Sequence, residues 1–395
     1  MKNTIKIFTV FIIIINFQFL TFAQEHPDFK IINEVKTTPV KNQGNSGTCW
    51  SFATTSFLET EIMRLTGIEQ DLSEMYFVYN AYLTKAEYYV RLHGLGNFSQ
   101  GGQAHDVINV IENEGLVSEA NFSGFKIKDS YDHSKLETSL KNYLDSIIKI
   151  NPVPSNWKSK FIEIINSQIG IINESAKLEA ITTLKIANEL KIEELPKTTK
   201  VEQEIYEVAI IDSNKESKKE SGISINTSNY YEITSFNHHD FYTNFDLEVP
   251  DNWSHNSYLN LPVDEMMKII DNALQNGYSV CWDGDVSEKN FNHRKGRAEL
   301  TDADLDSITK LGLQQYRQIT FENQTTTDDH LMHITGIATD NAGNKYYQTK
   351  NSWGDDSNKY GGYLYMSESF VGLKTIAILV NKDAISTEIL DKIYK

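Results

Sequence analysis

The chain contains the stretch Gln43-Gly44-Asn45-Ser46-Gly47-Thr48-Cys49-Trp50-Ser51-Phe52-Ala53, in which a lone cysteine follows a glycine-containing loop and opens a helix-like segment. The positive end of a helix dipole at Cys49 favours an ionised sulfur, and the thiolate is the nucleophilic form of cysteine. Backbone N–H groups at this helix start, together with the side-chain amide of Gln43, are suitable donors to an oxyanion on an attacked carbonyl. The stretch therefore predicts Cys49 as a nucleophile and Gln43 as an oxyanion donor.

Two histidines in the stretch Asp328-Asp329-His330-Leu331-Met332-His333-Ile334-Thr335-Gly336 compete for the role of general base. His330 precedes an apolar run and is expected at the exposed start of a strand. His333 lies inside that strand, where a rigid element would hold its ring, so we favour His333. Asn351 begins Asn351-Ser352-Trp353-Gly354 and is expected to orient the His333 ring and fix its tautomer. Cysteine, histidine and asparagine together form the parts of an acyl-transfer site.

The same residues allow plainer interpretations. Free cysteines are commonly buried in cores, and an Asn-Ser-Trp-Gly segment is compatible with a turn around a packed indole. The stretch Asp328-Asp329-His330 is compatible with a solvated loop, and it lacks the further ligands that a zinc site needs. The second cysteine, Cys281, lies in the short apolar run 278–282 and is expected to be an inert core thiol. A disulfide between Cys49 and Cys281 is conceivable but would consume the predicted nucleophile.

The N-terminus has the pattern of a secretory signal peptide. Lys2 and Lys6 give it a positive start, residues 7–20 are mostly apolar, and residues 21–23 place small side chains before Gln24. The apolar run is shorter than the roughly 20 residues of a membrane-spanning helix, although an uncleaved anchor is the alternative. We therefore expect residues 1–23 to be removed and the product to be exported, to the periplasm or as a secreted protein, without stable membrane insertion.

The chain is acidic, with a formal net charge of −17 over 395 residues. An acidic surface repels phosphate backbones, so a nucleic-acid partner is not expected. The length is sufficient for one large domain or for two lobes with a substantial core.

The order of the expected elements predicts two lobes and an insertion. Residues 24–125 form a helical lobe that carries the nucleophile, and residues 126–229, which are charged, poor in glycine and partly periodic, form a helical insertion. Residues 230–395 form a β-rich lobe that carries the base and the C-terminal segment. The expected helices are 50–65, 73–91, 105–114 and 263–276, and the expected strands are 231–236, 278–282, 333–339, 345–351 and 362–366.

The residues around Cys49, His333 and Asn351 resemble the papain-type cysteine peptidases, most closely the branch of bleomycin hydrolase and bacterial aminopeptidase C. Ser46 stands where the Cys-Gly-Ser-Cys-Trp pattern of papain-like enzymes has its first cysteine. His333 follows Cys49 by far more than the roughly 130–150 residues typical of papain and cathepsins, which fits the long insertion of this branch. The short segment before Cys49 leaves no room for a folded inhibitory propeptide.

This resemblance implies a papain-like α+β fold, with a helical lobe, a barrel-like β-rich lobe and a long helical insertion. It implies peptide substrates and no metal or organic cofactor. The implied roles are oxyanion donor for Gln43, nucleophile for Cys49, base for His333 and orienting residue for Asn351. A further pair of residues would line the cleft that receives the substrate backbone, namely Gly101 and Gly102.

The resemblance makes aminopeptidase action the first hypothesis and papain-like endopeptidase action the second. In the aminopeptidase branch the C-terminus lies in the cleft and restricts cleavage to N-terminal residues, and well-studied members are hexamers, so a homo-oligomer is compatible. Here residues 383–395 read as a charged amphipathic helix. A catalytically silent binding protein on the same fold is an alternative of another class. Transglutaminase-type acyl transfer is a further one, although it usually orients its histidine with an aspartate.

Overall fold

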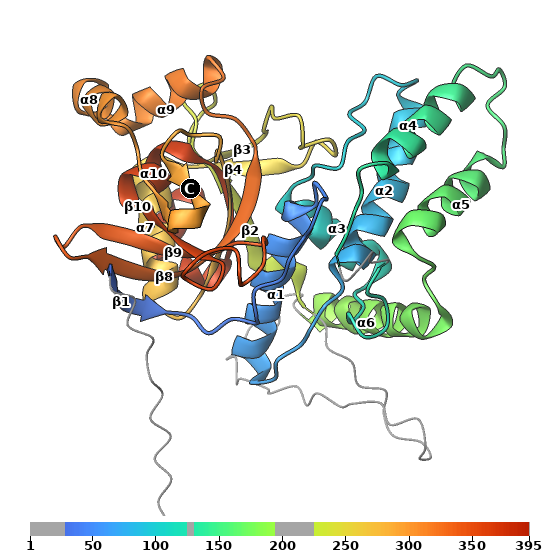
Figure 1. Cartoon of the computed structure of the whole chain (residues 1–395), viewed down its shortest axis with the longest axis horizontal. Helices are drawn as coiled ribbons and strands as arrows, with labels where there is room; N and C mark the ends of the chain where they lie inside the picture. Colours follow the sequence, from blue (N-terminus) through green and yellow to red (C-terminus); the bar gives the residue numbers. More distant parts are fainter. Residues whose placement is uncertain (1–27, 125–129, 194–224, 395) are drawn as a thin grey trace, which may run out of the picture.

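The computed structural model describes residues 28–124, 130–193 and 225–394 (Figure 1). The predicted signal peptide, residues 1–23, lies outside the described residues, as does part of the expected insertion. Within the described ranges, no helix combines the length and the apolar character needed to cross a lipid bilayer.

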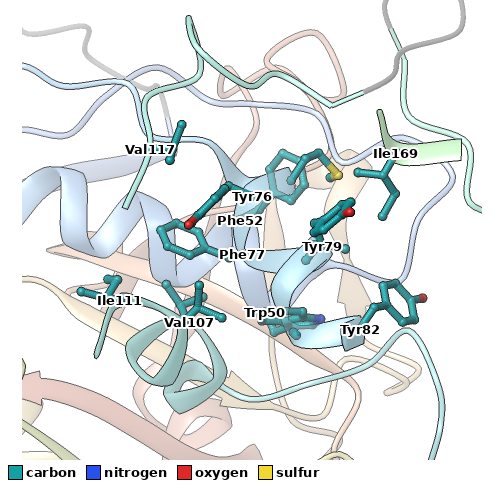
Figure 2. Close-up of a cluster of buried hydrophobic side chains, with 14 of the residues drawn as sticks. Trp50, Phe52, Tyr76, Phe77, Tyr79, Tyr82, Val107, Ile111, Val117 and Ile169 are labelled. Carbon is teal, nitrogen blue, oxygen red and sulfur yellow. The ribbon is translucent and has the colours of Figure 1, made fainter. Parts of the chain in front are cut away.

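The first half of the described chain is helical and packs around one core. Figure 2 shows that Trp50, Phe77 and Val107 come from three different helices and meet Ile169 of a fourth in this core. The helices are α1 (Cys49–Thr66), α2 (Glu74–Arg91), α3 (Ala104–Glu114), α4 (Leu136–Ile147), α5 (Trp157–Ile169) and α6 (Glu174–Glu193).

Local sequence explains where these helices begin and end. The Ser73 hydroxyl accepts a hydrogen bond from the backbone N–H of Tyr76 at 3.0 Å and so caps the start of α2. Gly67 ends α1 in the left-handed conformation, with φ of +72°, and its N–H returns to the carbonyl of Met63. The three helices expected between residues 50 and 114 are therefore present, with ends within about two residues of those expected.

The second half of the chain supplies most of one mixed sheet. Its strand order is β3-β4-β2-β11-β5-β8-β9-β10-β7-β6, and β1 pairs with β8 outside this path. The strands are β1 (Phe29–Glu34), β2 (Tyr230–Thr234), β3 (Thr243–Asp246), β4 (Ser257–Asn260), β5 (Val280–Gly284), β6 (Phe291–Asn292), β7 (Arg297–Ala298), β8 (His330–Asp340), β9 (Lys345–Lys350), β10 (Tyr363–Ser367) and β11 (Thr375–Asn381).

Helices cover this sheet, and the expected α+β papain-like fold is confirmed. Figure 1 shows the strands on one side of the molecule, α2 to α6 on the other, and α1 between them. The core of the β-rich half joins strand residues such as Trp282 and Ile334 to Met266 and Ile270 of α7. The helices of this half are α7 (Val263–Gln275), α8 (Asp302–Leu311), α9 (Leu313–Glu322), α10 (Glu368–Lys374) and α11 (Thr387–Ile393).

The predicted lobe boundaries differ from the packing in two places. Residues 29–34 fall within the predicted helical lobe, yet as β1 they pair with β8 and belong to the sheet. The helices α4, α5 and α6 of the predicted insertion share one core with α1, α2 and α3, because Leu140, Phe161 and Ala176 are buried in it. The described part of the insertion therefore enlarges the helical core.

Candidate active site

Cys49 is the first residue of α1, and the segment around Gln100 holds it in place. The Gly47 N–H donates to Gln100 Oε1 at 2.8 Å, and the indole of Trp50 donates to the Gln100 carbonyl at 2.9 Å. Gly44 has φ of +60°, and a Cβ at this position would lie 2.5 Å from the Tyr131 carbonyl oxygen. The loop before Cys49 can therefore lie close to its neighbours only because glycine occupies this turn.

The Cys49 sulfur is free and half-buried. Burial raises the pKa of its thiol to about 12, and the nearby carboxylates of Asp283, Asp328 and Asp251 act in the same direction. A backbone hydrogen bond from Leu331 and the positive end of α1 oppose this rise without reversing it. The sulfur therefore needs a base that removes its proton during attack.

His330 is the histidine that Asn351 orients. Its Nε2 lies 2.8 Å from Asn351 Oδ1, and the same oxygen accepts the backbone N–H of Ser352 at 2.8 Å. Because a backbone N–H can only donate, the atom facing it is the amide oxygen, and His330 Nε2 must carry the proton. His330 Nδ1 is then the unprotonated nitrogen. Burial lowers the pKa of this imidazole to about 4, so the ring is neutral and able to accept a proton.

The indole of Trp353 covers this hydrogen bond. Its ring lies 5.0 Å from the ring of His330 between centroids, at an angle of 31°. The amide nitrogen of Asn351 approaches His293 Nδ1 at 3.2 Å, and Trp353 also contacts His293 edge to face. Both the oxygen and the nitrogen of the Asn351 amide therefore have partners, so the amide is held with its oxygen toward His330.

The expectation that Asn351 orients His333 is wrong. His333 is fully buried, and its Nδ1 lies 2.9 Å from Ser56 Oγ, which also accepts a hydrogen bond from Lys350 at 2.7 Å. Burial and the charge of Lys350 lower the pKa of His333 well below its usual value. His333 therefore occupies the contact between β8 and α1, and the structure supports His330 in its place.

Strand geometry explains the difference between the two histidines. Successive side chains of a strand point to opposite faces, so residues three apart, such as His330 and His333, face opposite sides. The β8–β9 register pairs His333 with Lys350, the last residue of β9. Asn351 therefore follows the end of β9, alongside the first residue of β8, which is His330. The start of a strand, not its interior, reaches the loops that form the site.

The amide of Gln43 is fixed in two directions. Its Nε2 donates to the Ser46 carbonyl at 2.7 Å, and its Oε1 accepts the hydroxyl of Ser352 at 2.6 Å. An amide nitrogen carries two hydrogens, so one remains for a ligand. The sequence reasoning missed Ser352, although its place in the Asn-Ser-Trp-Gly segment offered a signal. Ser352 joins the loop of Gln43 to the segment of Asn351.

Gly101 and Gly102 lie in a crowded segment. A Cβ at Gly101 would lie 1.8 Å from Asp251 Oδ2, and one at Gly102 would lie 2.6 Å from Asp106 Oδ2. The absence of side chains at both positions therefore lets acidic groups approach the backbone. Their predicted contact with a substrate backbone stays a prediction.

Cys281 and the histidines of another loop lie outside this arrangement. Cys281 is free and buried, pairs with His333 across β5 and β8, and lies 3.6 Å from the Thr54 hydroxyl. Among the described residues, the group spaced closely enough to hold a metal ion is His238, His239 and Glu248, and neither Cys49 nor His330 belongs to it.

Comparison with known proteins points to cysteine peptidases. The family model described as Peptidase C1-like family matches residues 173–395, and the one described as Papain family cysteine protease matches residues 24–182. Aminopeptidase C of Lactobacillus helveticus is 30% identical over 137 residues, which cover 35% of this chain and 30% of that protein. Aminopeptidase C of Lactococcus lactis is 22% identical over 396 residues, covering 93% of this chain and 85% of that protein.

A solved structure agrees with these matches at the level of the fold. The structure of PepW from Lactobacillus rhamnosis superimposes with a TM-score of 0.65 and 17% identity. The superposition covers 92% of this chain and 84% of that one. Both halves of the chain thus follow a single known architecture.

Proposed function

Since this chain belongs to the Peptidase C1-like family, we propose that it hydrolyses peptide bonds through a thioester on Cys49, with His330 as the general base. The observation that carries this proposal is the hydrogen bond between His330 Nε2 and Asn351 Oδ1. It leaves His330 Nδ1 unprotonated, which is the state that a base for the Cys49 thiol requires.

The proposed reaction uses groups that the structure has already positioned. His330 Nδ1 removes the thiol proton as the sulfur attacks the carbonyl carbon, and the C–N bond breaks when the imidazolium protonates the departing amine. The Cys49 N–H and the Gln43 amide donate to the oxyanion, each contributing about 3 kcal/mol. Water then attacks the thioester, with His330 again acting as the base, and releases the carboxylic acid and the free thiol.

Aminopeptidase action is the proposed specificity, and the names of the aligned relatives support it. The described C-terminal residues contact the β-rich half. Its helix α11 packs into the core of the β-rich half through Ile389, and Lys392 binds Glu265 of α7 at 2.6 Å. The hydroxyl of Tyr394, the last described residue, contacts that of Tyr231 in β2. Helix α11 therefore belongs to the β-rich half through its described contacts.

Substrates with free and blocked N-termini test this specificity. We expect leucyl-aminomethylcoumarin to be cleaved at least about tenfold faster than its N-acetyl form, because only the free form presents an ammonium group. The measurement is kcat/KM for both compounds, with a Cys49→Ala preparation as the background. Equal rates on the two compounds would leave endopeptidase action as the better description. No turnover of either compound, or of unblocked and blocked peptides, would favour a silent binding protein.

Export is proposed from residues 1–23 alone. The expected result is that the mature protein begins near Gln24 when the full chain is expressed in a bacterium with a general secretory pathway. Intact mass and N-terminal sequencing of the periplasmic and culture fractions provide the measurement. Recovery of the uncleaved chain in the membrane fraction would instead support the anchor.

A further inference from the structure

Three carboxylates raise the pKa of the Cys49 thiol through their charge. Asp251, Asp283 and Asp328 come from the segment before β4, from β5, and from the loop before β8, and all three act on the charge of the Cys49 thiol. The β5–β8 register pairs Asp283 with Leu331, whose backbone N–H reaches the Cys49 sulfur. Asp251 lies against the backbone of Gly101, as the 1.8 Å approach to a Cβ there shows.

Asp283 is a buried carboxyl group without a well-aligned hydrogen-bond donor among the described residues. It is 3% exposed, and neither of its carboxylate oxygens has a hydrogen-bond partner of good geometry among the described residues. The neighbouring groups able to hydrogen-bond to it are the Gln103 amide, which lowers its pKa, and the Asp328 carboxyl, which raises it. Buried polar groups are normally hydrogen-bonded, so an unpaired carboxylate beside a nucleophile indicates a place where a donor is to be received.

Asp328 is held toward the same place by a buried amide. Gln103 is 1% exposed, its Nε2 donates to Asp328 Oδ2 at 2.8 Å, and its Oε1 accepts the hydroxyl of Tyr258 at 3.3 Å. Gln103 directly follows Gly102 in the chain, so one segment presents both the predicted backbone-binding glycines and the support for Asp328.

The nearby cations already have other partners. Lys85 Nζ donates to the carbonyl oxygens of Ser99 and Gly101. His105 Nδ1 lies 3.0 Å from Glu232 Oε2. Both cations influence the acidic groups around them, yet neither forms an ion pair with Asp283 or Asp328 within the described part of the chain. The carboxyl groups of Asp283 and Asp328 therefore have no ion-pair partner among the described residues.

We propose that Asp283 and Asp328, with Asp251 at their side, bind a positively charged group of the peptide substrate next to the scissile bond. The group is an ammonium or guanidinium, either the free α-amino group or a lysine or arginine side chain. The proposal rests on the proposed peptidase function, and it supplies a source of exopeptidase preference. A metal ion fits less well, because the described carboxylates form no set whose ligand atoms all lie within 4.8 Å of one another.

The protonation of the resting site agrees with this assignment. Burial raises the pKa of Asp328 to about 7, and burial together with Asp328 raises that of Asp283 well above its usual value. Each shift reflects burial of the carboxyl group and the negative charge of its acidic neighbours. A bound ammonium group would favour the ionised carboxylates and so be held by them.

The experiment neutralises the two carboxylates and compares charged with uncharged substrates. Asp283→Asn and Asp328→Asn keep the shape of the side chains. Each substitution is expected to lower kcat/KM for leucyl-aminomethylcoumarin at least about tenfold. The kcat/KM for N-acetyl-leucyl-aminomethylcoumarin is expected to change less than about twofold. Asp329→Asn is the matched control, because Asp329 is the exposed neighbour of Asp328, and it is expected to leave both rates unchanged.

A second pair of compounds identifies the source of the charge. N-acetyl-lysyl-leucyl-aminomethylcoumarin and its norleucyl analogue differ only in the side-chain ammonium. If the variants lose kcat/KM only on the lysyl compound, the bound charge is the side-chain ammonium. If they lose kcat/KM only on the unblocked leucyl compound, the bound charge is the α-amino group. Equal losses on charged and uncharged substrates, or no loss on either, would overturn the proposal.

A readout without turnover separates this proposal from the peptidase function. Leucinamide is expected to protect Cys49 from iodoacetamide at concentrations at which N-acetyl-leucinamide does not, and Asp283→Asn or Asp328→Asn is expected to abolish the difference. Protection without hydrolysis would contradict the peptidase proposal and keep the cation site. Hydrolysis without differential protection would contradict the cation site. Circular dichroism melting of each variant shows that it is folded.

Discussion

Replacing His330 with alanine is expected to lower kcat/KM at least about 10³-fold, close to the background set by Cys49→Ala. The reason is that His330 is the ring held by Asn351 with its Nδ1 unprotonated, and the Cys49 thiol stays neutral without a base. Peptide hydrolysis and the rate of Cys49 alkylation by iodoacetamide, both at neutral pH, provide the measurements. Alkylation is included because it reports on loss of the thiol proton without any need for substrate.

His333 supplies the control for this prediction. His333→Gln is expected to reduce the free energy of unfolding, by about 1–3 kcal/mol, because it disturbs the buried contact with Ser56. The kcat of this variant is calculated from the concentration of Cys49 that iodoacetamide can alkylate. It is expected to remain within about threefold of the kcat of the unsubstituted protein, since His333 does not contact Asn351. If His333→Gln lowered kcat about 10³-fold while His330→Ala remained active, His333 would be the general base.

Local patterns are sufficient to predict much of the helical half and to select Cys49 as the candidate nucleophile. The helix start at Cys49 follows from a glycine loop leading into an apolar period of 3.6, and the helix expected at residues 73–91 is present as α2, which begins at Glu74. These features depend on neighbours along the chain. The apolar run likewise predicts a strand at residues 333–339 from neighbouring residues, although β8 begins earlier, at His330.

The choice between the two histidines depended on pairing between distant residues. Both lie in one apolar run, and alternation shows only that they face opposite sides. Which side meets Asn351 is decided by the register of β8 with β9 and by the contact of His333 with Ser56 on α1. A rigid strand interior would favour His333, but helix α1, which begins at Cys49, covers that interior.

The acidic region could not be predicted from local sequence for a similar reason. Asp251, Asp283 and Asp328 are far apart in the chain and belong to three separate segments. Charges on a chain with a net charge of −17 are common, so none of the three stands out alone. The β5–β8 register and the buried Gln103 amide bring two of them together, and both features become visible only in three dimensions.

Replacing Gln43 with glutamate is expected to lower kcat about 10²–10³-fold with little change in KM. Glutamate keeps the shape and an acceptor for the Ser352 hydroxyl, but it removes the N–H that the proposed oxyanion needs and adds a negative charge beside it. Because this donor acts mainly on the transition state, the loss should fall on kcat. Ser352→Ala is the matched variant, since it leaves the amide in place but frees its oxygen end, and about a tenfold loss is expected. Steady-state kinetics on leucyl-aminomethylcoumarin measure both. A rise in KM at constant kcat for Gln43→Glu would show that the Gln43 amide contacts the ground-state substrate, and the Cys49 N–H would then be left as the oxyanion donor.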